Sequence, residues 1–378
     1  MKIKIFRLRS TLANEQIVKK MNDDFLKELD IECANVNNDN FSYVLVESGG
    51  TESLFVELLP KLNKNIILLT NGENNSLPAS LEILTYLNNK GYVGEILHGS
   101  IKQIKNKLEK INSKHINFGL IGEPSDWLIA SSVDEIQLKK LMNAQLIKIN
   151  YEEFIKEYDK RIYEKNDRIN ELINRFNSKD LDNSLCVYGA IKRLIKKYNL
   201  QAITIRCFDL ISIRKATACI ALALLNEEGI VATCEGDVTT MTTMFFAKKY
   251  LNQNSFQANP SLIDEENQNI IFAHCTIPFD MLDNYTLDTH FESDLGLAIS
   301  GNLKKEKVTV FKLSNDLKNA FIKVGTIKEN LHNPRRCRTQ IKVHFDENIS
   351  EMLHHPFGNH HIIIYGDYYD KIIRILNK

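Results

Sequence analysis

The chain has 378 residues, which is long for one ordinary domain and predicts two or three. Hydrophobic residues make up 43% and charged residues 25%, a balance typical of a folded protein and not of a disordered one. The 48 Lys and Arg residues are matched by 48 Asp and Glu residues, which argues against nucleic-acid binding because the basic surplus that neutralises phosphates is absent.

Cysteine spacing and hydropathy indicate the cellular compartment in which the protein is expected. The seven cysteines contain no CxxC pair, which disfavours a secreted disulfide framework and favours reduced thiols. No apolar signal-peptide core follows residues 1–6, and the longest apolar runs fall short of the roughly 20 residues that span a bilayer. We therefore expect a cytoplasmic protein that does not contact membranes.

The first third of the chain alternates short apolar runs with amphipathic stretches, the pattern of a parallel sheet with crossover helices. Buried strands are expected at residues 43–46 and 66–70. The first of these runs into Gly49-Gly50-Thr51-Glu52, in which a glycine pair suits a sharp turn and Thr51 suits a helix cap.

A second unit of the same kind is expected from about residue 116. Its strands are predicted at 117–121, 202–205 and 230–234, and its helices at 215–226 and from 238 to about 251. The charged stretch 151–176 has a helical period and predicts one long, solvated helix.

After residue 255 the pattern becomes mostly β. Short strands are predicted at residues 269–274, 295–299, 308–313, 319–324, 340–345 and 362–365, as in a small barrel or sandwich. The predicted fold class is α/β, with two doubly wound parallel-sheet domains followed by a β-rich, barrel-like C-terminal domain. The predicted domains are residues 1–115, 116–255 and 256–378.

Glu235 lies where a predicted parallel strand ends and a helix begins. Ligands bind at this carboxyl end in open α/β sheets. Gly236 permits a sharp turn there, and Asp237 suits the helix cap. The alternative is that Glu235 and Asp237 are both capping carboxylates without a role in a site.

Histidines gather at two further predicted strand ends. His274 ends a strand, and four of the ten histidines fall within residues 354–361. Adjacent side chains of a strand face opposite ways, so at most one of His360 and His361 faces a given site. A carboxylate with imidazoles suits Mn²⁺, Fe²⁺ or Zn²⁺. The alternatives are a structural histidine at 274 and a His-rich surface loop at 354–355.

These segments resemble a known family. The chain is similar to the L-fucose isomerase and L-arabinose isomerase superfamily, most closely to its shorter fucose isomerase-like members. The similarity runs through nearly the whole chain and rests on these motifs: Ser-Gly-Gly-Thr-Glu at 48–52, Gly-Glu-Pro-Ser-Asp-Trp-Leu-Ile-Ala-Ser at 122–131, Cys-Glu-Gly-Asp-Val at 234–238, Ala-His-Cys at 273–275, Asn-His-His at 359–361 and Tyr-Gly-Asp at 365–367.

The resemblance implies a homo-oligomeric aldose–ketose isomerase that acts on a small sugar through an ene-diol, with Mn²⁺ or another divalent cation. It implies that Glu235 binds the metal and transfers protons, and that His274 is a ligand. It favours His361 over His360 as the last ligand, because the family's final histidine directly precedes an apolar strand. His360 then becomes a candidate for substrate binding.

One position departs from the family. Asn259 stands where the family has a second acid that binds metal and transfers protons, so we assign Asn259 to both the metal and the catalytic set. An amide oxygen can coordinate a hard cation, but it cannot act as a general base near neutral pH. Two alternatives therefore stay open: a sugar-binding or regulatory homologue that does not isomerise, and an enzyme with altered enediolate chemistry.

Substrate contacts are less constrained by the sequence. Trp127 and Arg338 join His360 as candidates for substrate binding. Basic side chains that would suit a phosphate or sulfonate tail are Arg335, Arg336, Arg338 and His290. The alternative is that these arginines are ordinary surface residues.

Overall fold

The computed structural model describes residues 2–11, 14–34, 41–112 and 116–377. The chain divides into two compact units, Met1–Lys114 and His115–Lys378, and each is described by itself. Within the described residues, no helix combines the length and the apolar character needed to cross a membrane.

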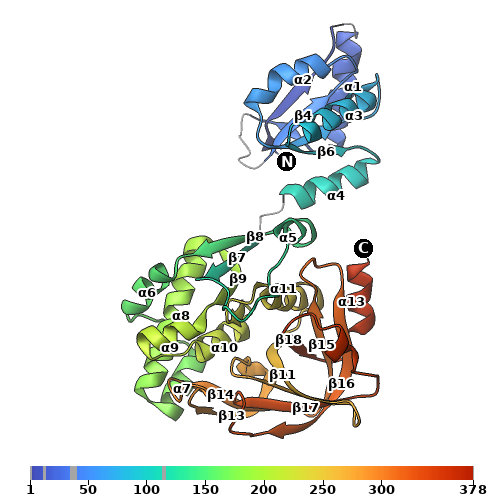
Figure 1. The fold of residues 1–378 in the computed structure, drawn as a ribbon. Coiled ribbons are helices and arrows are strands. Elements are labelled where there is room, and N and C mark those ends of the chain that lie inside the picture. The colour runs from blue at the N-terminus through green and yellow to red at the C-terminus, as the bar shows by residue number, and fades with distance from the viewer. Residues whose placement is uncertain (1, 12–13, 35–40, 113–115, 378) are drawn as a thin grey trace. The chain divides into compact units, whose positions relative to one another are not determined.

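The first unit is a parallel sheet between two layers of helices (Figure 1). The strands of the sheet lie in the order β2-β4-β5-β6, and β1 pairs separately with β3. The strands are β1 (Lys2–Ile3), β2 (Ile5–Leu8), β3 (Glu32–Cys33), β4 (Ser42–Val46), β5 (Asn65–Leu69) and β6 (Val93–Leu97). The helices are α1 (Glu15–Glu28), α2 (Glu52–Leu58), η1 (Leu59–Lys61), α3 (Ser76–Asn89) and α4 (Ile101–Asn112).

Alternate residues of β4 explain this layering. Tyr43 and Leu45 pack with α1 and α4, whereas Val44 and Val46 pack with α2 and α3 on the other face. A strand with both faces covered needs a continuous apolar run, which is what β4 has.

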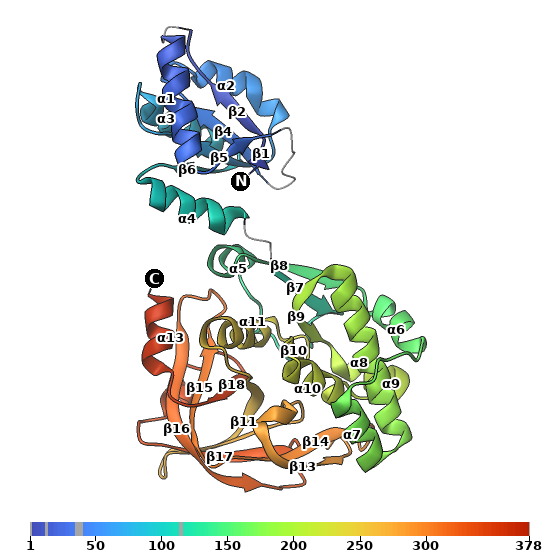
Figure 2. The same cartoon turned by 180° about the vertical axis from the view of Figure 1, so that it is seen from behind.

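The second unit begins with another parallel sheet, in the order β10-β9-β7-β8. Its strands are β7 (Ile116–Ile121), β8 (Ala144–Ile149), β9 (Leu200–Ile205) and β10 (Val231–Cys234). Its helices are α5 (Glu135–Met142), α6 (Tyr151–Asp159), α7 (Asp167–Phe176), α8 (Lys179–Tyr198), α9 (Cys207–Arg214), α10 (Cys219–Glu227), α11 (Val238–Phe246) and the π-helical turn η2 (Ala247–Leu251). Helices α8 and α10 pack on one face of the sheet, and α5 and α11 on the other (Figure 2).

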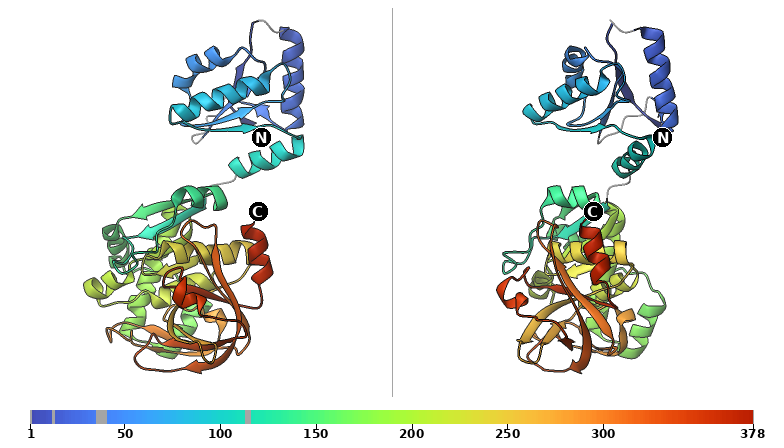
Figure 3. Two further views of the ribbon diagram at one scale, coloured as in Figure 1. Left: turned by 45° about the vertical axis from the view of Figure 1, so that its right-hand side comes forward. Right: turned by 90° about the vertical axis from the view of Figure 1, so that its right-hand side faces the viewer.

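The rest of the second unit is a closed antiparallel barrel in the order β11-β12-β17-β16-β15-β18. The elements of this part are β11 (Phe256–Asp264), β12 (Asn269–His274), η3 (Phe279–Met281), β13 (Leu282–Asp288), β14 (Ala298–Leu303), β15 (Lys307–Leu313), β16 (Ala320–Leu331), β17 (Thr339–Phe345), α12 (Glu351–His354), β18 (His361–Tyr365) and α13 (Tyr369–Leu376). Strands β13 and β14 pair beside the barrel, and α13 covers its outer surface (Figure 3).

The α/β class with a barrel-like C-terminal part is therefore confirmed. The barrel packs directly on the sheet's helices: Phe246 of α11 meets Phe311 of β15 edge to face at 6.1 Å between ring centroids. Because both parts share one compact unit, the predicted domain boundary near residue 255 stays a prediction. The carboxyl edge of β7, β9 and β10 lies against the barrel strands, where Gln257 of β11 accepts a hydrogen bond from the Cys234 amide at 2.9 Å.

Candidate functional site

Glu235 sits in a constrained turn at the end of β10. Its φ is +68° and that of Gly236 is +71°, and a left-handed conformation costs a non-glycine residue about 1–2 kcal/mol. A Cβ added to Gly236 would lie 2.8 Å from both the Glu123 carbonyl oxygen and the Pro124 Cα. The Ser125 amide donates to the Glu235 carbonyl at 2.9 Å, so two loops meet backbone to backbone and fix the carboxylate.

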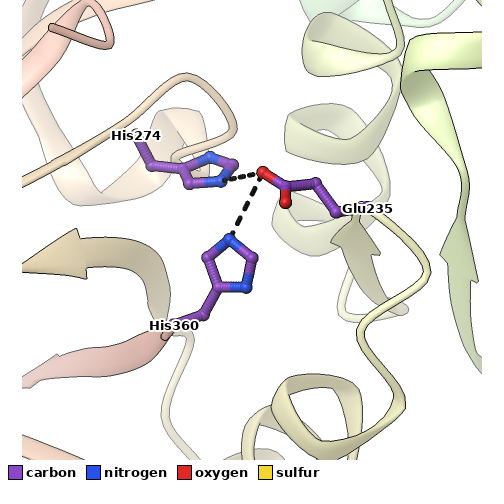
Figure 4. Close-up of side chains that lie close together, drawn as sticks. All are labelled: Glu235, His274 and His360. Atoms are coloured by element: carbon purple, nitrogen blue, oxygen red, sulfur yellow. Dashed lines mark ion pairs between the residues drawn. The ribbon is translucent and has the colours of Figure 1, made fainter. Parts of the chain in front are cut away.

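Glu235, His274 and His360 form one buried group (Figure 4). Their ligand atoms all lie within 4.8 Å of one another, and Glu235 Oε1 is 3.8 Å from His274 Nε2 and 3.4 Å from His360 Nε2. Thr276 fixes His274 through a contact of 3.1 Å between its hydroxyl and Nδ1. Both Nε2 atoms are buried and lack a hydrogen-bond partner among the described residues. One carboxylate and two free imidazole nitrogens could hold a divalent metal ion.

A second carboxylate orients His360. Asp237 Oδ2 lies 2.8 Å from His360 Nδ1, so Nδ1–H can donate to it, and Nε2, which faces Glu235, would offer a lone pair to a metal ion once it loses its proton. Asp237 also caps α11, because its Oδ1 accepts from the Thr240 amide at 2.8 Å. Lys312 of β15 lies 3.8 Å from Asp237 Oδ2, and both residues are fully buried. The predicted cap at Asp237 is confirmed, and it has a further role that sequence reasoning missed.

The pKa values follow from this crowding of charges. Burial opposes ionisation of Glu235, but His360 and His274 outweigh it and hold the pKa of its carboxyl well below the usual range. Burial also opposes the charged form of His360, yet Glu235 and Asp237 raise the pKa of His360 to about 9. Without a metal ion, His360 is therefore protonated on both ring nitrogens at neutral pH, with Nδ1–H facing Asp237 and Nε2–H facing Glu235.

Trp127 contacts the other oxygen of Glu235. Its Nε1–H donates to Glu235 Oε2 at 2.7 Å, while 52% of the residue stays exposed. Its ring meets Phe208 edge to face at 4.9 Å between centroids. The indole therefore fixes the carboxylate and leaves Oε1 for the two histidines.

Asn259 lies on β11 opposite Ala273, the residue before His274. Its side-chain oxygen is buried and has no hydrogen-bond partner among the described residues. Asp264 does not take the place of the expected acid, because it accepts from the amide and the side chain of Asn267, at 3.0 and 2.9 Å, in the exposed turn after β11.

His361 lies apart from the group of three. Its Nδ1 is 3.0 Å from the Asn359 carbonyl oxygen, and its ring meets Phe321 edge to face at 5.1 Å. Burial and the nearby charge of Lys312 lower the pKa of His361 to about 3. The structure thus places His360, and not the preferred His361, beside Glu235 and His274. The ligand roles of these residues stay predictions.

Glu235 and His274 open onto a cavity of about 370 Å³, within the range of small-molecule sites. Its lining consists of Cys207, Phe208, Ile211, Thr217, Ala218, Cys219, Cys234, Glu235, Asn259, Ser261, His274, Cys275, His290, Phe291, Glu292, Arg335, Arg336 and Cys337. Arg338 is not part of this lining, because its guanidinium binds the Thr289 carbonyl at 2.7 Å and lies 3.3 Å from Asp288.

The lining includes five of the seven cysteines, which sequence reasoning did not bring together. Cys207 and Cys234 Sγ atoms approach to 2.6 Å. Cys275 contacts the thiols of both Cys219 and Cys337. The histidines at 354 and 355 lie on the surface, away from this cavity.

Known relatives of the chain are sugar isomerases by name. Two proteins called sulfoquinovose isomerase, from Priestia aryabhattai and Priestia megaterium, are each 23% identical over 276 residues. The matched segment covers 69% of this chain and 62% of each relative. A sulfoquinovose isomerase from a Clostridium species is 22% identical over 209 residues, covering 52% of this chain and 47% of the relative. No family model matches the chain.

Substituting His360 and His361 one at a time tests which of these adjacent histidines binds the metal ion. His360→Gln should weaken Mn²⁺ binding by more than about 100-fold, because a direct ligand should matter more than an outer partner. His361→Gln should leave the affinity within about threefold, because its ring faces Phe321. Titration calorimetry measures both affinities, and circular dichroism checks that both variants fold. Equal losses in the two variants would contradict this assignment.

Asp237→Asn tests the orienting carboxylate. Asparagine retains an oxygen that can cap α11 but loses the charge that holds His360 Nδ1–H, so Mn²⁺ affinity should fall by about 10–100-fold. Asp346→Asn is the matched control, because the Asp346 side chain is 99% exposed. An unchanged affinity in Asp237→Asn would remove this role from the carboxylate.

Metal binding should depend on pH with a definite sign. Binding requires neutral His360, whose pKa in the metal-free protein is raised to about 9. Below that pH the ion must displace a proton, so apparent affinity should rise by about tenfold per pH unit and level off above pH 9. Calorimetry in buffers of different ionisation enthalpy should detect about one proton released per ion. An apparent affinity that stays constant from about pH 6 to about pH 9 would contradict the displacement of a proton from His360.

Proposed function

We propose that this chain is an aldose–ketose isomerase that works with a bound divalent ion, Mn²⁺ being our proposed choice. The observation that carries the proposal is the buried Glu235–His274–His360 group, whose two imidazole Nε2 atoms have no partner among the described residues. Glu235 and His274 reach a cavity of small-molecule size. The names of the relatives support the same reaction class.

Isomerisation moves a proton between two adjacent carbons of an open-chain sugar through an ene-diol. A bound divalent ion would supply an electrophile for the two sugar oxygens. Glu235 is ionised, buried and fixed by Trp127, so its carboxylate is suited to take the proton from one carbon and return it to the other. Asn259 would hold a sugar hydroxyl or the ion through its free side-chain oxygen.

The same site favours a second candidate, a sugar-binding protein that does not isomerise. Asn259 cannot replace the carboxylate expected at its position. In addition, a carboxyl whose pKa lies well below its usual range is a weak proton acceptor, and Glu235 has such a pKa in the metal-free protein. Glu235 would then serve as a ligand alone.

Glu235→Gln distinguishes the two candidates. With Mn²⁺ restored after chelation, the parent chain should exchange the C2 proton of its aldose in deuterated water and form the ketose. Glu235→Gln should slow both by about 100-fold or more, because the amide accepts no proton. Glu265→Gln, an exposed change in the turn after β11, is the control.

NMR measures the exchange, and calorimetry measures sugar binding. Binding of the sugar without exchange in the parent chain supports the binding role. Exchange that survives unchanged in Glu235→Gln rules out this carboxylate as the base.

A further inference from the structure

Two arginines share the cavity with the candidate metal group. Arg335 and Arg336 lie on the connection between β16 and β17, and both line the cavity together with Glu235 and His274. Arg335 is exposed and Arg336 is half-buried, so this connection forms one part of the cavity wall that meets solvent. A molecule that enters from solvent therefore meets guanidinium groups in the same cavity as the carboxylate.

The connection that carries these arginines is braced. The amides of Arg335 and Arg336 donate to the side chain and carbonyl of Asn333, at 3.0 and 3.2 Å. Gln340 of β17 holds Asn333 from the other side, accepting from its amide at 3.0 Å and donating to its carbonyl at 2.8 Å. The backbone that presents the two guanidinium groups is thus tied to a barrel strand.

Within the part of the chain that the structure describes, neither guanidinium has a protein partner. Among the described residues, the side chains of Arg335 and Arg336 make no hydrogen bond or ion pair, in contrast to Arg338, which binds Thr289 and Asp288. Of the lining residues, these two arginines carry the permanent positive charges, against the exposed carboxylate of Glu292. The solvent side of the cavity therefore keeps a positive charge in excess.

We propose that Arg335 and Arg336 bind a tetrahedral, strongly acidic group on the tail of the sugar, a sulfonate or a phosphate. This assignment rests on the proposed function, which puts the reacting carbons at Glu235. Arginine suits such a group because its planar fork donates two parallel hydrogen bonds to an oxyanion. The relatives' name denotes a sugar that carries a sulfonate, which supports sulfonate as the first choice.

The test compares three sugars on one set of variants. Glucose with a sulfonate at carbon 6, glucose 6-phosphate and unsubstituted glucose are given to the full chain with Mn²⁺. The variants are Arg335→Gln, Arg336→Gln, the double variant, and Arg374→Gln on the exposed side of α13 as the matched control. Both kcat and KM are measured, and calorimetry measures equilibrium binding.

The double variant should lose roughly 10-fold to 100-fold in affinity for the acidic sugar, the scale of lost hydrogen bonds to a charged group. The loss should appear in KM more than in kcat, and kcat/KM for glucose should change little. The acidic sugar preferred by the parent chain identifies the group as sulfonate or phosphate. Equal losses for acidic and neutral sugars, or no loss, would overturn the proposal.

Calorimetry separates this proposal from the proposed function. If the parent chain turns over no sugar but binds the acidic sugar more tightly than glucose, and the double variant abolishes that preference, the anion site stands while the isomerase proposal fails. If the parent chain isomerises sugars without any preference for an acidic tail, the isomerase proposal stands and the anion site fails.

Discussion

The buried carboxylate of Asp237 is the contact on which the second unit depends. It caps α11 through Thr240, meets Lys312 of the barrel at 3.8 Å and holds His360 at 2.8 Å. A buried charge without partners is strongly unfavourable, so each partner is needed by the others. One side chain thereby joins the parallel sheet, the barrel wall and the candidate metal group, and the orientation of His360 follows from how the two parts of the unit pack.

The backbone conformation at Glu235 also constrains the candidate site. A left-handed residue followed by a left-handed glycine turns the chain sharply where β10 ends. The close approach of Gly236 to Glu123 and Pro124 leaves no room for a side chain, so this pair of loops defines the turn. Strain of this kind persists only where the surrounding structure over-determines it, and it gathers at functional sites. Trp127 then fixes the carboxylate itself.

Local patterns in the sequence predicted the strands but not the contacts between distant segments. The apolar runs at 43–46, 117–121 and 202–205 fall within or on β4, β7 and β9, because a strand buried on both faces needs such a run. The long helix predicted at 151–176 is wrong: α6 ends at Asp159 and α7 begins at Asp167. Between them, the Ile162 carbonyl lies so close to Gly189 of α8 that no Cβ would fit, so tertiary packing overrides the helical period.

The candidate site shows the same limit. The position of Glu235 at a strand end was visible in the sequence, but the choice between His360 and His361 depends on which face of β18 meets α11. Asp237 is 123 residues from His360, and neither residue's neighbours in the chain indicate the contact. Arg335 and Arg336 likewise line the cavity because the barrel closes, and no local sequence pattern encodes that closure.

The thiols in the cavity wall add sulfur to the oxygen and nitrogen atoms that could bind a metal ion there. Five cysteines line the same space as a carboxylate, an amide oxygen and an imidazole. Hard ions prefer the oxygens, whereas Cu⁺ prefers sulfur, so the same cavity offers ligands to both kinds of ion. A copper ion held by the cysteines would fill part of the cavity that Glu235 and His274 reach. We therefore expect thiophilic metals to block this cavity by binding to its thiols.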